Sequence, residues 1–381
     1  MIKILQIVGK MNLGGAEIML MDILRHKPQD VHFDFLINQN DLERGKFDDE
    51  ILSLGCTIFR IGTQGHIGPF KYVSELRKVI EKVKPDVIHS HLNAKSGFIA
   101  LASRLCGIKH FVSHSHAEIK FRGNFLVRLT RESEMFLQKW LIDWFSSDFW
   151  GCSEAANKSL FWPWRQEKAV VINNAIDTEK YRIVDTLAIN TLRKSYDLPS
   201  DCIVMGNVGR IVRHKGIAFI PDVMMELKSL GQDSAFVIVG RPDDSDYIDE
   251  MMAKALRYGV NNRIIMLGER SDIPIIMNTF DVFVGPALQE GFGMVAVEAQ
   301  AAGIPCVLYK GFPKLVDMNL DLISFQDNFN AREWAKVVCS LKGKKLTDRD
   351  FVTTTIKKQG FDSVRNAEVV CNIYKEIACK N

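Results

Sequence analysis

Two glutamates flank a pair of glycines in the segment PALQEGFGMVAVEAQAAGIP, residues 286–305. Glu290 immediately precedes Gly291, and Glu298 follows Gly293 within an expected helix. Glycines let a backbone approach a ligand closely, and the N–H groups that open a helix attract an anion. Carboxylates accept hydrogen bonds from hydroxyl groups such as those of a sugar. The segment therefore predicts a cradle for a diphosphate beside a sugar, although a glycine-flanked helix start with Glu298 in solvent gives the same pattern.

Two cations lie in a second segment, GNVGRIVRHKG, residues 206–216. The segment joins an expected strand to an expected helix, so Arg210 and Lys215 would flank the end of the strand. A diphosphate needs positive charge at such a place, and each charge-assisted hydrogen bond contributes about 1.5–3 kcal/mol. A basic helix cap would show the same residues. The inference of a diphosphate site therefore depends on the two segments together.

Short β-rich runs alternate with helix-length segments along the chain, which predicts parallel sheets covered by helices. We therefore expect an α/β protein with two doubly wound domains. The expected strands of the first half are 2–8, 33–37, 87–89 and 111–113, and those of the second half are 203–208, 235–239, 264–267, 282–284 and 306–308.

A polar stretch without a strong strand, residues 174–198, marks the expected domain boundary. We expect an N-terminal domain over residues 1–178 and a C-terminal domain over residues 179–360. Residues 361–381 contain an amphipathic helix pattern, which could pack back on the N-terminal domain. Doubly wound sheets bind ligands at the carboxyl ends of their strands, so a ligand with two halves would lie between the two domains.

Length and composition suit a two-domain globular protein, with 381 residues, 47% hydrophobic and 25% charged. The net charge is +3 and basic residues alternate with acidic ones, so we expect no nucleic-acid partner. The eight cysteines are scattered, which suits a reducing cytosol. Residues 1–8 lack the apolar stretch of a signal peptide, and no apolar run could span a bilayer. We expect a cytoplasmic protein.

Nearly the whole chain resembles the retaining family-4 glycosyltransferases. In the C-terminal half the resemblance rests on Gly209-Arg210 with Lys215-Gly216, on VIVG (237–240) and IMLG (265–268), and on the spacing of Glu290 and Glu298. In the N-terminal half it rests on MNLGGAE (11–17), DVIHSH (86–91), GCSE (151–154) and INNAID (172–177). The chain looks most similar to bacterial enzymes of exopolysaccharide or capsule assembly, through SHSH (113–116) and the NAID stretch.

On the donor side, the resemblance implies that Arg210 and Lys215 bind the diphosphate of the donor. Glu298 would bind the ribose, and Glu290 the transferred sugar. The loop residues expected to complete the diphosphate site are Gly291, Phe292, Gly293 and Met294.

On the acceptor side, the resemblance implies that Gly14 and Gly15 line the cleft near donor and acceptor. His116 matches the histidine that the family places near the reacting sugar, and His114 is a nearby rival. A histidine at the end of a strand can also be an ordinary hydrogen-bonded polar residue.

The resemblance further implies the GT-B architecture, in which two Rossmann-like domains face each other across a cleft. A hexosyltransferase of this family would move a sugar from a nucleotide-sugar to a growing saccharide with retained anomeric configuration. UDP is the expected carrier because it is the commonest in the family, and the acceptor would be polyprenyl-linked. We expect no cofactor, since the nucleotide-sugar is a substrate.

Two features differ from what the family pattern alone would give. Lys314 stands where many relatives have glutamate, which bears on acceptor or sugar preference. Asp244-Ser-Asp246 and Asp348-Arg-Asp350 resemble the metal motif of the other glycosyltransferase architecture. Both fit acidic helix starts better, because aspartate caps helix N-termini. We therefore expect no metal.

Residues 119–150 combine aromatic and basic side chains. Phe136, Trp140 and Trp144 recur at four-residue spacing. Such a helix could rest on an anionic membrane surface, whereas an aromatic stripe at this spacing also fits a core helix. The basic residues alongside are Lys120, Arg122, Arg128, Arg131 and Lys139.

Three other functions remain open on the sequence. A nucleotide-sugar epimerase could share the two-domain frame. A dinucleotide-dependent oxidoreductase ranks lower, because the glycines at 9, 14 and 15 do not match the G-x-G-x-x-G spacing. A sugar-nucleotide-binding partner without activity is disfavoured by the presence of both cations and both glutamates.

Overall fold

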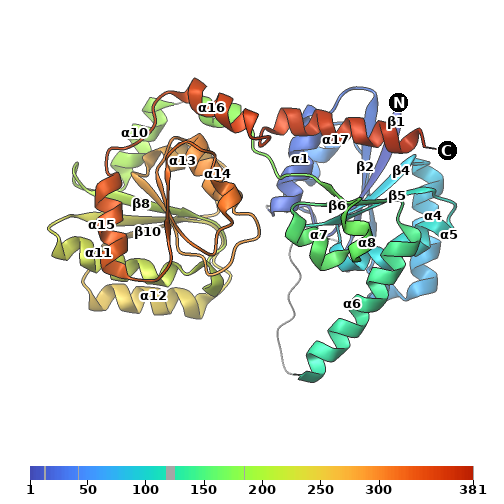
Figure 1. Cartoon of the computed structure of the whole chain (residues 1–381), viewed down its shortest axis with the longest axis horizontal. Helices are drawn as coiled ribbons and strands as arrows, with labels where there is room; N and C mark the ends of the chain where they lie inside the picture. Colours follow the sequence, from blue (N-terminus) through green and yellow to red (C-terminus); the bar gives the residue numbers. More distant parts are fainter. Residues whose placement is uncertain (13, 42, 117–124, 184, 381) are drawn as a thin grey trace. The chain divides into compact units, whose positions relative to one another are not determined.

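The computed structural model describes residues 1–12, 14–41, 43–116, 125–183 and 185–380. The chain forms two compact units (Figure 1). Unit 1 consists of Met1–Ala175 and Gly360–Asn381, and unit 2 of Ile176–Gln359. The C-terminal segment therefore belongs to the same unit as the N-terminus.

Unit 1 is built on seven parallel strands in the order β3-β2-β1-β4-β5-β6-β7. The strands are β1 (Ile2–Val8), β2 (Val31–Asn38), β3 (Ile58–Ile61), β4 (Val87–Ser90), β5 (His110–Ser115), β6 (Asp148–Gly151) and β7 (Val170–Val171). The helices are α1 (Gly15–His26), α2 (Asp48–Ser53), α3 (Gln64–Ile67), α4 (Pro69–Val83), η1 (Asn93–Lys95), α5 (Ser96–Leu105), α6 (Phe125–Phe145), α7 (Glu154–Leu160), α8 (Pro163–Gln166) and α17 (Ser363–Ala378).

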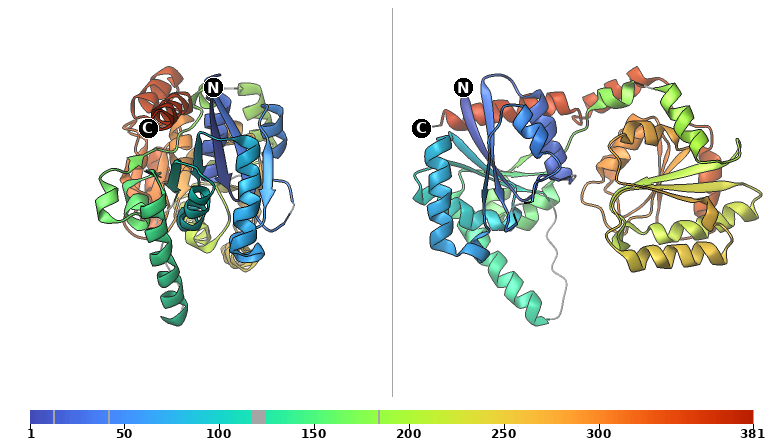
Figure 2. Two further views of the ribbon diagram at one scale, coloured as in Figure 1. Left: turned by 90° about the vertical axis from the view of Figure 1, so that its right-hand side faces the viewer. Right: turned by 180° about the vertical axis from the view of Figure 1, so that it is seen from behind.

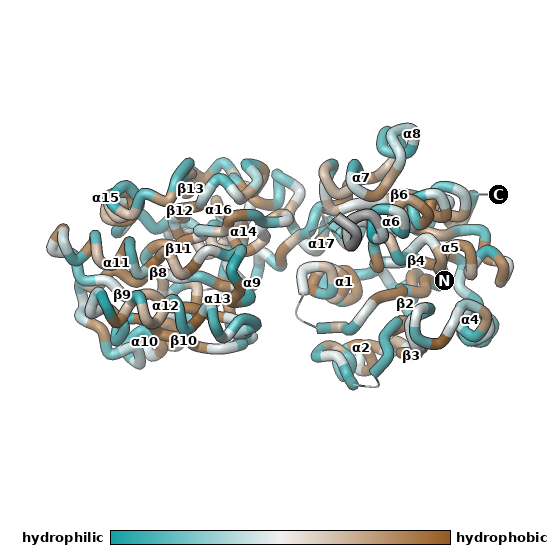
Figure 3. The backbone as a smooth tube through the Cα atoms, turned by 90° about the horizontal axis from the view of Figure 1, so that it is seen from below, coloured by the Kyte–Doolittle hydropathy of each residue, from teal (hydrophilic) through white to brown (hydrophobic). Residues whose placement is uncertain are grey.

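Alternate residues of β1 enter two different cores, because successive side chains of a strand point to opposite faces. Ile4 and Val8 pack with residues of α1 and α17 on one face, whereas Leu5 and Ile7 pack with α4 and α5 on the other. Helix α17 lies beside α1 in both views of the ribbon (Figures 1 and 2). The central strands are thus hydrophobic on both faces, as is usual in parallel sheets, and Figure 3 colours much of these strands as hydrophobic.

Unit 2 repeats this plan with six parallel strands in the order β10-β9-β8-β11-β12-β13. The strands are β8 (Ile203–Val208), β9 (Ser234–Val239), β10 (Ile264–Gly268), β11 (Val282–Gly285), β12 (Cys306–Tyr309) and β13 (Ile323–Gln326). The helices are α9 (Thr178–Arg182), α10 (Thr186–Ser195), η2 (Arg213–Lys215), η3 (Ile217–Phe219), α11 (Ile220–Ser229), α12 (Ser245–Arg257), η4 (Asn261–Arg263), α13 (Ile273–Thr279), α14 (Met294–Ala301), η5 (Lys314–Val316), α15 (Ala331–Leu341) and α16 (Arg349–Lys358).

The α/β class and the two doubly wound, parallel sheets confirm the prediction from sequence. Strands β3, β6, β7 and β13 were not predicted. They have two to four residues each, and β3, β7 and β13 lie at sheet edges. Strands this short show few alternations, which makes them hard to detect by periodicity. Within the described part of the chain, no helix is both long and apolar enough to cross a membrane.

Candidate active site

Both sheets reverse the direction of their strand order at a switch point, which lies between β1 and β4 in unit 1 and between β8 and β11 in unit 2. Open α/β sheets bind ligands at the carboxyl ends of the strands that flank this point. In unit 2, Gly209 to Lys215 follow β8, and Pro286 to Gly293 follow β11. The two segments singled out in the sequence therefore flank one switch point.

Lys215 and Glu290 form an ion pair between these two segments. Their side chains are only 19% and 12% exposed. The backbone N–H of Leu288 donates to the carbonyl of His214 at 2.8 Å, and that of Glu290 to the carbonyl of Gly311 at 3.0 Å. The first of these bonds joins the two loops and brings the cation and the carboxylate together, and the second fixes the Glu290 loop to the residues after β12.

Two glycines permit the close packing of these loops, one against a backbone carbonyl and one against an aromatic ring. Gly216 has φ +69°, and a Cβ there would lie 2.1 Å from the carbonyl oxygen of Pro286. Gly293 has φ +87°, and a Cβ there would lie 2.5 Å from Cδ1 of Phe312. Both backbone conformations are ones that residues with a Cβ rarely adopt. By contrast, a Cβ on Gly291 would meet nothing within 4 Å among the described atoms.

Arg210 lies close to the same strand end and is 60% exposed. Its Nη1 atom is 3.5 Å from Oδ2 of Asp243, a long and weak contact. Asp243 also accepts a hydrogen bond from Nε of Arg241 at 2.5 Å, and this bond, with the nearby positive charges, lowers the pKa of the Asp243 carboxyl. Asp243 is therefore satisfied without Arg210, which leaves the guanidinium accessible to an anion.

Helix α14 begins at Met294, as the sequence predicts, and Gly293 precedes it. Phe292 is buried and Glu298 is half-buried in the second turn. Gln300, fully buried, donates to the carbonyl of Val316 at 2.7 Å and accepts from the N–H of Met318 at 3.0 Å. These bonds fix α14 to the segment around η5, so the direction of its N-terminus is determined by buried contacts.

In unit 1, Gly14 precedes α1 and Gly15 opens it. The N–H of Ile18 donates to the carbonyl of Gly14 at 2.9 Å, which is the first bond of the helix. The carboxylate of Glu17 lies so close to Gly14 that a Cβ there would be 2.2 Å from its Oε2 atom. Burial raises the pKa of Glu17.

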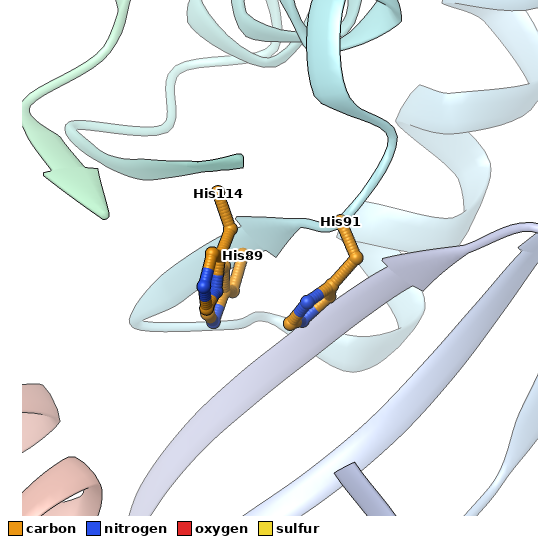
Figure 4. A group of neighbouring side chains, drawn as sticks. All are labelled: His89, His91 and His114. Atoms are coloured by element: carbon orange, nitrogen blue, oxygen red, sulfur yellow. The ribbon is translucent and has the colours of Figure 1, made fainter. Parts of the chain in front are cut away.

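Four histidines gather at the carboxyl ends of β4 and β5, and Figure 4 shows three of them, His89, His91 and His114. His116 is the fourth: its Nε2 atom lies 2.8 Å from Nδ1 of His91. Nε2 of His89 lies 3.1 Å from Nδ1 of His114. The rings of His114 and His116 stack at 3.9 Å between centroids. The sequence singled out His116 and His114, and the structure joins them to two histidines of the DVIHSH segment that received no role.

All four histidines have lowered pKa values, chiefly because burial disfavours the charged ring. The pKa of His116 falls to about 4, and mutual repulsion among the rings contributes for the other three. The imidazoles are therefore neutral at pH 7, with one N–H and one lone pair each.

His89, His91 and His114 could each offer one nitrogen, all within 4.8 Å of one another, as metal ligands. Both ring nitrogens of His89 and of His91, however, already have hydrogen-bond partners. The rings meet as hydrogen-bonded and stacked pairs, with their nitrogens directed at one another. This geometry favours a hydrogen-bond network, and the expected absence of a metal stays a prediction.

The Asp-x-Asp pairs of the sequence are helix starts, as predicted. Asp244 accepts a hydrogen bond from the N–H of Tyr247 at 3.0 Å and caps α12. Asp348 accepts from the N–H of Phe351 at 2.9 Å and caps α16. Lys314, the departure from the family pattern, opens η5.

The aromatic residues of α6 form a surface cluster with two tryptophans that the sequence analysis missed, Trp162 and Trp164. Phe136 is 56%, Trp144 65% and Trp164 52% exposed, which excludes a core role for these side chains. Nζ of Lys139 lies 5.0 Å from the ring centre of Trp162. Of the basic residues noted beside the stripe, Lys120 and Arg122 lie outside the described residues, as does the side chain of Arg128.

Comparison with known proteins connects these features to a family. Residues 14–175 match the family described as "Glycosyl transferase 4-like domain", and residues 188–357 match the family described as "Glycosyl transferases group 1". EpsF of Bacillus subtilis, described as a glycosyltransferase, is 30% identical over 380 residues, which cover 98% of this chain and 96% of EpsF.

Two further relatives carry more specific names. The capsular polysaccharide biosynthesis glycosyltransferase CapH of Staphylococcus aureus is 25% identical, with 91% of this chain and 92% of CapH covered. The UDP-Gal:alpha-D-GlcNAc-diphosphoundecaprenol alpha-1,3-galactosyltransferase of Escherichia coli is 29% identical, with 64% of this chain and 62% of that enzyme covered. These relatives are transferases, so they give the epimerase alternative no support.

Among solved structures, HepE of Anabaena in complex with UDP superposes with a TM-score of 0.79 at 21% identity, covering 98% of this chain and 100% of HepE. This likeness concerns the fold, and it agrees with two Rossmann-like units. The chain therefore belongs to the family of glycosyltransferases that join a glycosyl transferase 4-like domain to a group 1 domain in the GT-B fold.

Proposed function

We propose that the protein transfers a sugar from a UDP-sugar to a growing, polyprenyl-linked saccharide of a bacterial surface polysaccharide, with retained anomeric configuration and without a metal ion. The observation that carries the proposal is the Lys215–Glu290 pair at the switch point of unit 2. The names of CapH and of the Escherichia coli galactosyltransferase, and the UDP bound to HepE, support the reaction and the carrier.

The diphosphate would replace Glu290 as the partner of Lys215. A diphosphate carries more negative charge than one carboxylate, so it competes well for the ammonium group. Arg210 is exposed and only weakly held by Asp243, so it can turn toward the same anion. The backbone N–H groups of Gly291 to Met294, where α14 begins, would add further donors. These groups would stabilise the leaving diphosphate electrostatically.

Glu290, once released by Lys215, would accept a hydrogen bond from a hydroxyl of the transferred sugar. Its negative charge would also stabilise the positive charge that develops on the sugar as the diphosphate leaves. Glu298, in the second turn of α14, would bind the ribose. On the acceptor side, Nδ1 of His116 is buried and has no partner among the described residues, so a sugar hydroxyl could complete its hydrogen bonding. Gly14 and Gly15 would line this side.

Binding of the donor is tested by thermal shift with a panel of nucleotides and nucleotide-sugars. A ligand present at 100 times its dissociation constant stabilises the protein by about 2.7 kcal/mol. We expect UDP and one UDP-sugar to raise the melting temperature. Stabilisation by GDP but not UDP would show that the donor carries guanine and not uracil. If no nucleoside diphosphate has an effect, the proposed donor site is wrong.

Stereochemistry and metal dependence are tested on the purified reaction. We expect the anomeric configuration of the sugar in the product, read by NMR coupling constants, to match that of the donor. An inverted centre would refute retention. Turnover should persist in EDTA, and activity that disappears in EDTA and returns with Mn²⁺ or Mg²⁺ would refute metal independence.

We also propose that the aromatic surface formed by Phe136, Trp140, Trp144, Trp162 and Trp164, on α6 and at the start of α8, rests on the inner face of the cytoplasmic membrane. Tryptophan is favoured at membrane interfaces because its ring is apolar and its N–H is polar. Lys139 lies beside the cluster and would face anionic headgroups. A polyprenyl-linked acceptor would be presented at such a surface.

Flotation with liposomes tests this contact. We expect the protein to float with anionic vesicles and Trp144→Ser with Trp164→Ser to lose most of this binding. Phe70→Ser is the matched control, because Phe70 on α4 is 91% exposed and lies outside the cluster. Equal flotation of the double variant and the control would refute the contact.

A further inference from the structure

A chain of hydrogen bonds leads from β1 to the histidine proposed to meet the reacting sugar. Oε1 of Gln6 lies 2.9 Å from Nε2 of His91, and Nδ1 of His91 lies 2.8 Å from Nε2 of His116. Gln6 is fully buried and His91 nearly so. The remaining nitrogen of His116, Nδ1, has no partner among the described residues.

A second chain starts from the same amide and crosses to the C-terminal helix. Nε2 of Gln6 donates to the hydroxyl of Tyr374, on α17, at 3.1 Å. That hydroxyl lies 2.5 Å from Nδ1 of His89, and Nε2 of His89 lies 3.1 Å from Nδ1 of His114. This chain also ends at a buried nitrogen without a partner among the described residues, Nε2 of His114.

The two chains have a direction, because a neutral imidazole has one N–H and one lone pair. All four rings are neutral, since their pKa values are lowered. Each ring that accepts at one nitrogen must therefore donate at the other. Once the proton at one end of either series of hydrogen bonds is placed, the position of every other proton in that series follows.

Tyr374 supplies the starting point. The amide nitrogen of Gln6 donates to the Tyr374 hydroxyl, so the hydroxyl directs its own proton to its other partner, Nδ1 of His89. The hydroxyl has a single proton and cannot also donate to Gln6. The same orientation of the Gln6 amide turns its carbonyl oxygen toward His91.

We infer that Tyr374 and Gln6 are positioning residues that hold all four histidines as Nε2–H tautomers. His91 then donates to Gln6 and accepts from His116, so His116 presents a lone pair at Nδ1. His89 accepts from Tyr374 and donates to His114, so His114 presents an N–H at Nε2. Reversing the amide of Gln6 would reverse every bond and convert all four rings to the Nδ1–H form.

This inference deepens the proposed function, on which its catalytic meaning rests. A lone pair at Nδ1 lets His116 accept a hydrogen bond or a proton from a sugar hydroxyl, whereas an N–H there could only donate. Helix α17, from the end of the chain, thereby helps to determine what the candidate active site can bind.

Imidazole tautomers are read directly by NMR of protein labelled with ¹⁵N in its histidine rings, because protonated and unprotonated ring nitrogens have widely separated shifts. We expect the four rings, assigned by single substitutions of histidine by glutamine, to show the Nε2–H pattern at pH 7.5. An Nδ1–H form of His116 in the wild-type protein would overturn the inference, and so would binding of Zn²⁺ at the four rings.

Two variants test the order of the bonds. Tyr374→Phe removes the hydroxyl that orients the amide, so all four rings should show a mixture of tautomers. Gln6→Met has nearly the same volume and interrupts only the branch to His91 and His116, so His89 and His114 should keep the Nε2–H form. Four unchanged rings in Tyr374→Phe would overturn the inference. The wild-type spectrum decides it even if a variant fails to fold.

Kinetics connect the tautomers to the reaction. We expect both variants to lower kcat by about tenfold while KM for the donor changes less than about twofold, because the donor nucleotide is assigned to unit 2. If His116→Ala keeps wild-type turnover, the proposed role of His116 fails. The tautomer pattern is measured without any substrate, so it decides the inference separately.

Discussion

At the scale of single residues, two side chains of unit 2 to which we assign roles in donor binding, Lys215 and Glu290, are each other's partners. Lys215 and Glu290 neutralise one another in a place where neither is well hydrated. Burying either charge alone would be costly. The pairing keeps both side chains beside the strand ends. In the proposed function, the diphosphate of the donor would replace Glu290 as the partner of Lys215.

Lys215→Ala should weaken binding of UDP by about 10- to 100-fold, which corresponds to the loss of one charge-assisted hydrogen bond. Isothermal calorimetry measures the affinity. The variant should still fold, because the backbone hydrogen bond between the two loops remains, but it should lose some stability as the carboxylate loses its cation. Lys194→Ala, on α10, is a control for the loss of one positive charge. Equal affinity of wild type and Lys215→Ala would reject the assignment to the diphosphate.

Glu290→Gln and Glu298→Gln should separate sugar from nucleotide. The amide at residue 290 keeps its size but loses the negative charge, so turnover should fall by about tenfold or more, at about 1.4 kcal/mol for each factor of ten. Affinity for UDP should hardly change. Glu298→Gln should instead weaken binding of UDP itself, because its expected partner is the ribose. Equal losses of UDP affinity in both variants, with turnover of Glu290→Gln intact, would contradict this division.

At the scale of elements, the loops that hold the site depend on glycine where two backbones meet. The residues after β8 and those after β11 approach so closely at Gly216 that a side chain would collide with Pro286. The position of Lys215, one residue earlier, is therefore determined by backbone packing.

Gly216→Ala should lower the free energy of unfolding by about 1–3 kcal/mol, because alanine is strained at φ +69° and its Cβ meets the carbonyl oxygen of Pro286. Urea denaturation measures the effect. Gly291→Ala is the matched control, since a Cβ there meets no described atom within 4 Å. Similar stability of the two variants would show that the close approach of the loops is not required.

At the scale of the whole molecule, four neutral histidines make unit 1 sensitive to acid. Their pKa values in the folded protein lie below the ordinary value of 6.5, whereas in the unfolded chain they return to it. Below pH 6.5 the unfolded state therefore binds more protons than the folded state. The stabilisation is fully present above pH 6.5 and is lost as the pH falls toward about 4, the pKa of His116.

The free energy of unfolding should accordingly decrease between pH 7 and pH 5, by up to about 1.4 kcal/mol per pH unit for each extra proton bound by the unfolded chain. Urea titrations at pH 7, 6 and 5 measure this slope. The variant His116→Asn should show a shallower slope than the wild type. A stability that is constant over this range would contradict the burial of neutral rings.

The sequence alone determined the α/β class, the two doubly wound units and the places where chemistry gathers. These depend on local features: strand periodicity, glycines at strand ends, and cations or carboxylates just beyond them. Asp244 and Asp348 were correctly predicted to be helix caps for the same reason, since a cap bonds to a backbone N–H three residues away.

The tertiary structure decided which of these residues meet. Lys215 pairs with Glu290 because β8 and β11 are neighbours in the sheet, although 75 residues separate the two side chains. Tyr374 reaches His89 across 285 residues because α17 packs on the face of the sheet that carries the histidines. Periodicity and motif spacing describe a residue's own element, whereas hydrogen bonds of this kind depend on strand order and on the helix that covers the sheet. For that reason His89 and His91 could be recognised as part of a motif, but their partners Gln6 and Tyr374 could not.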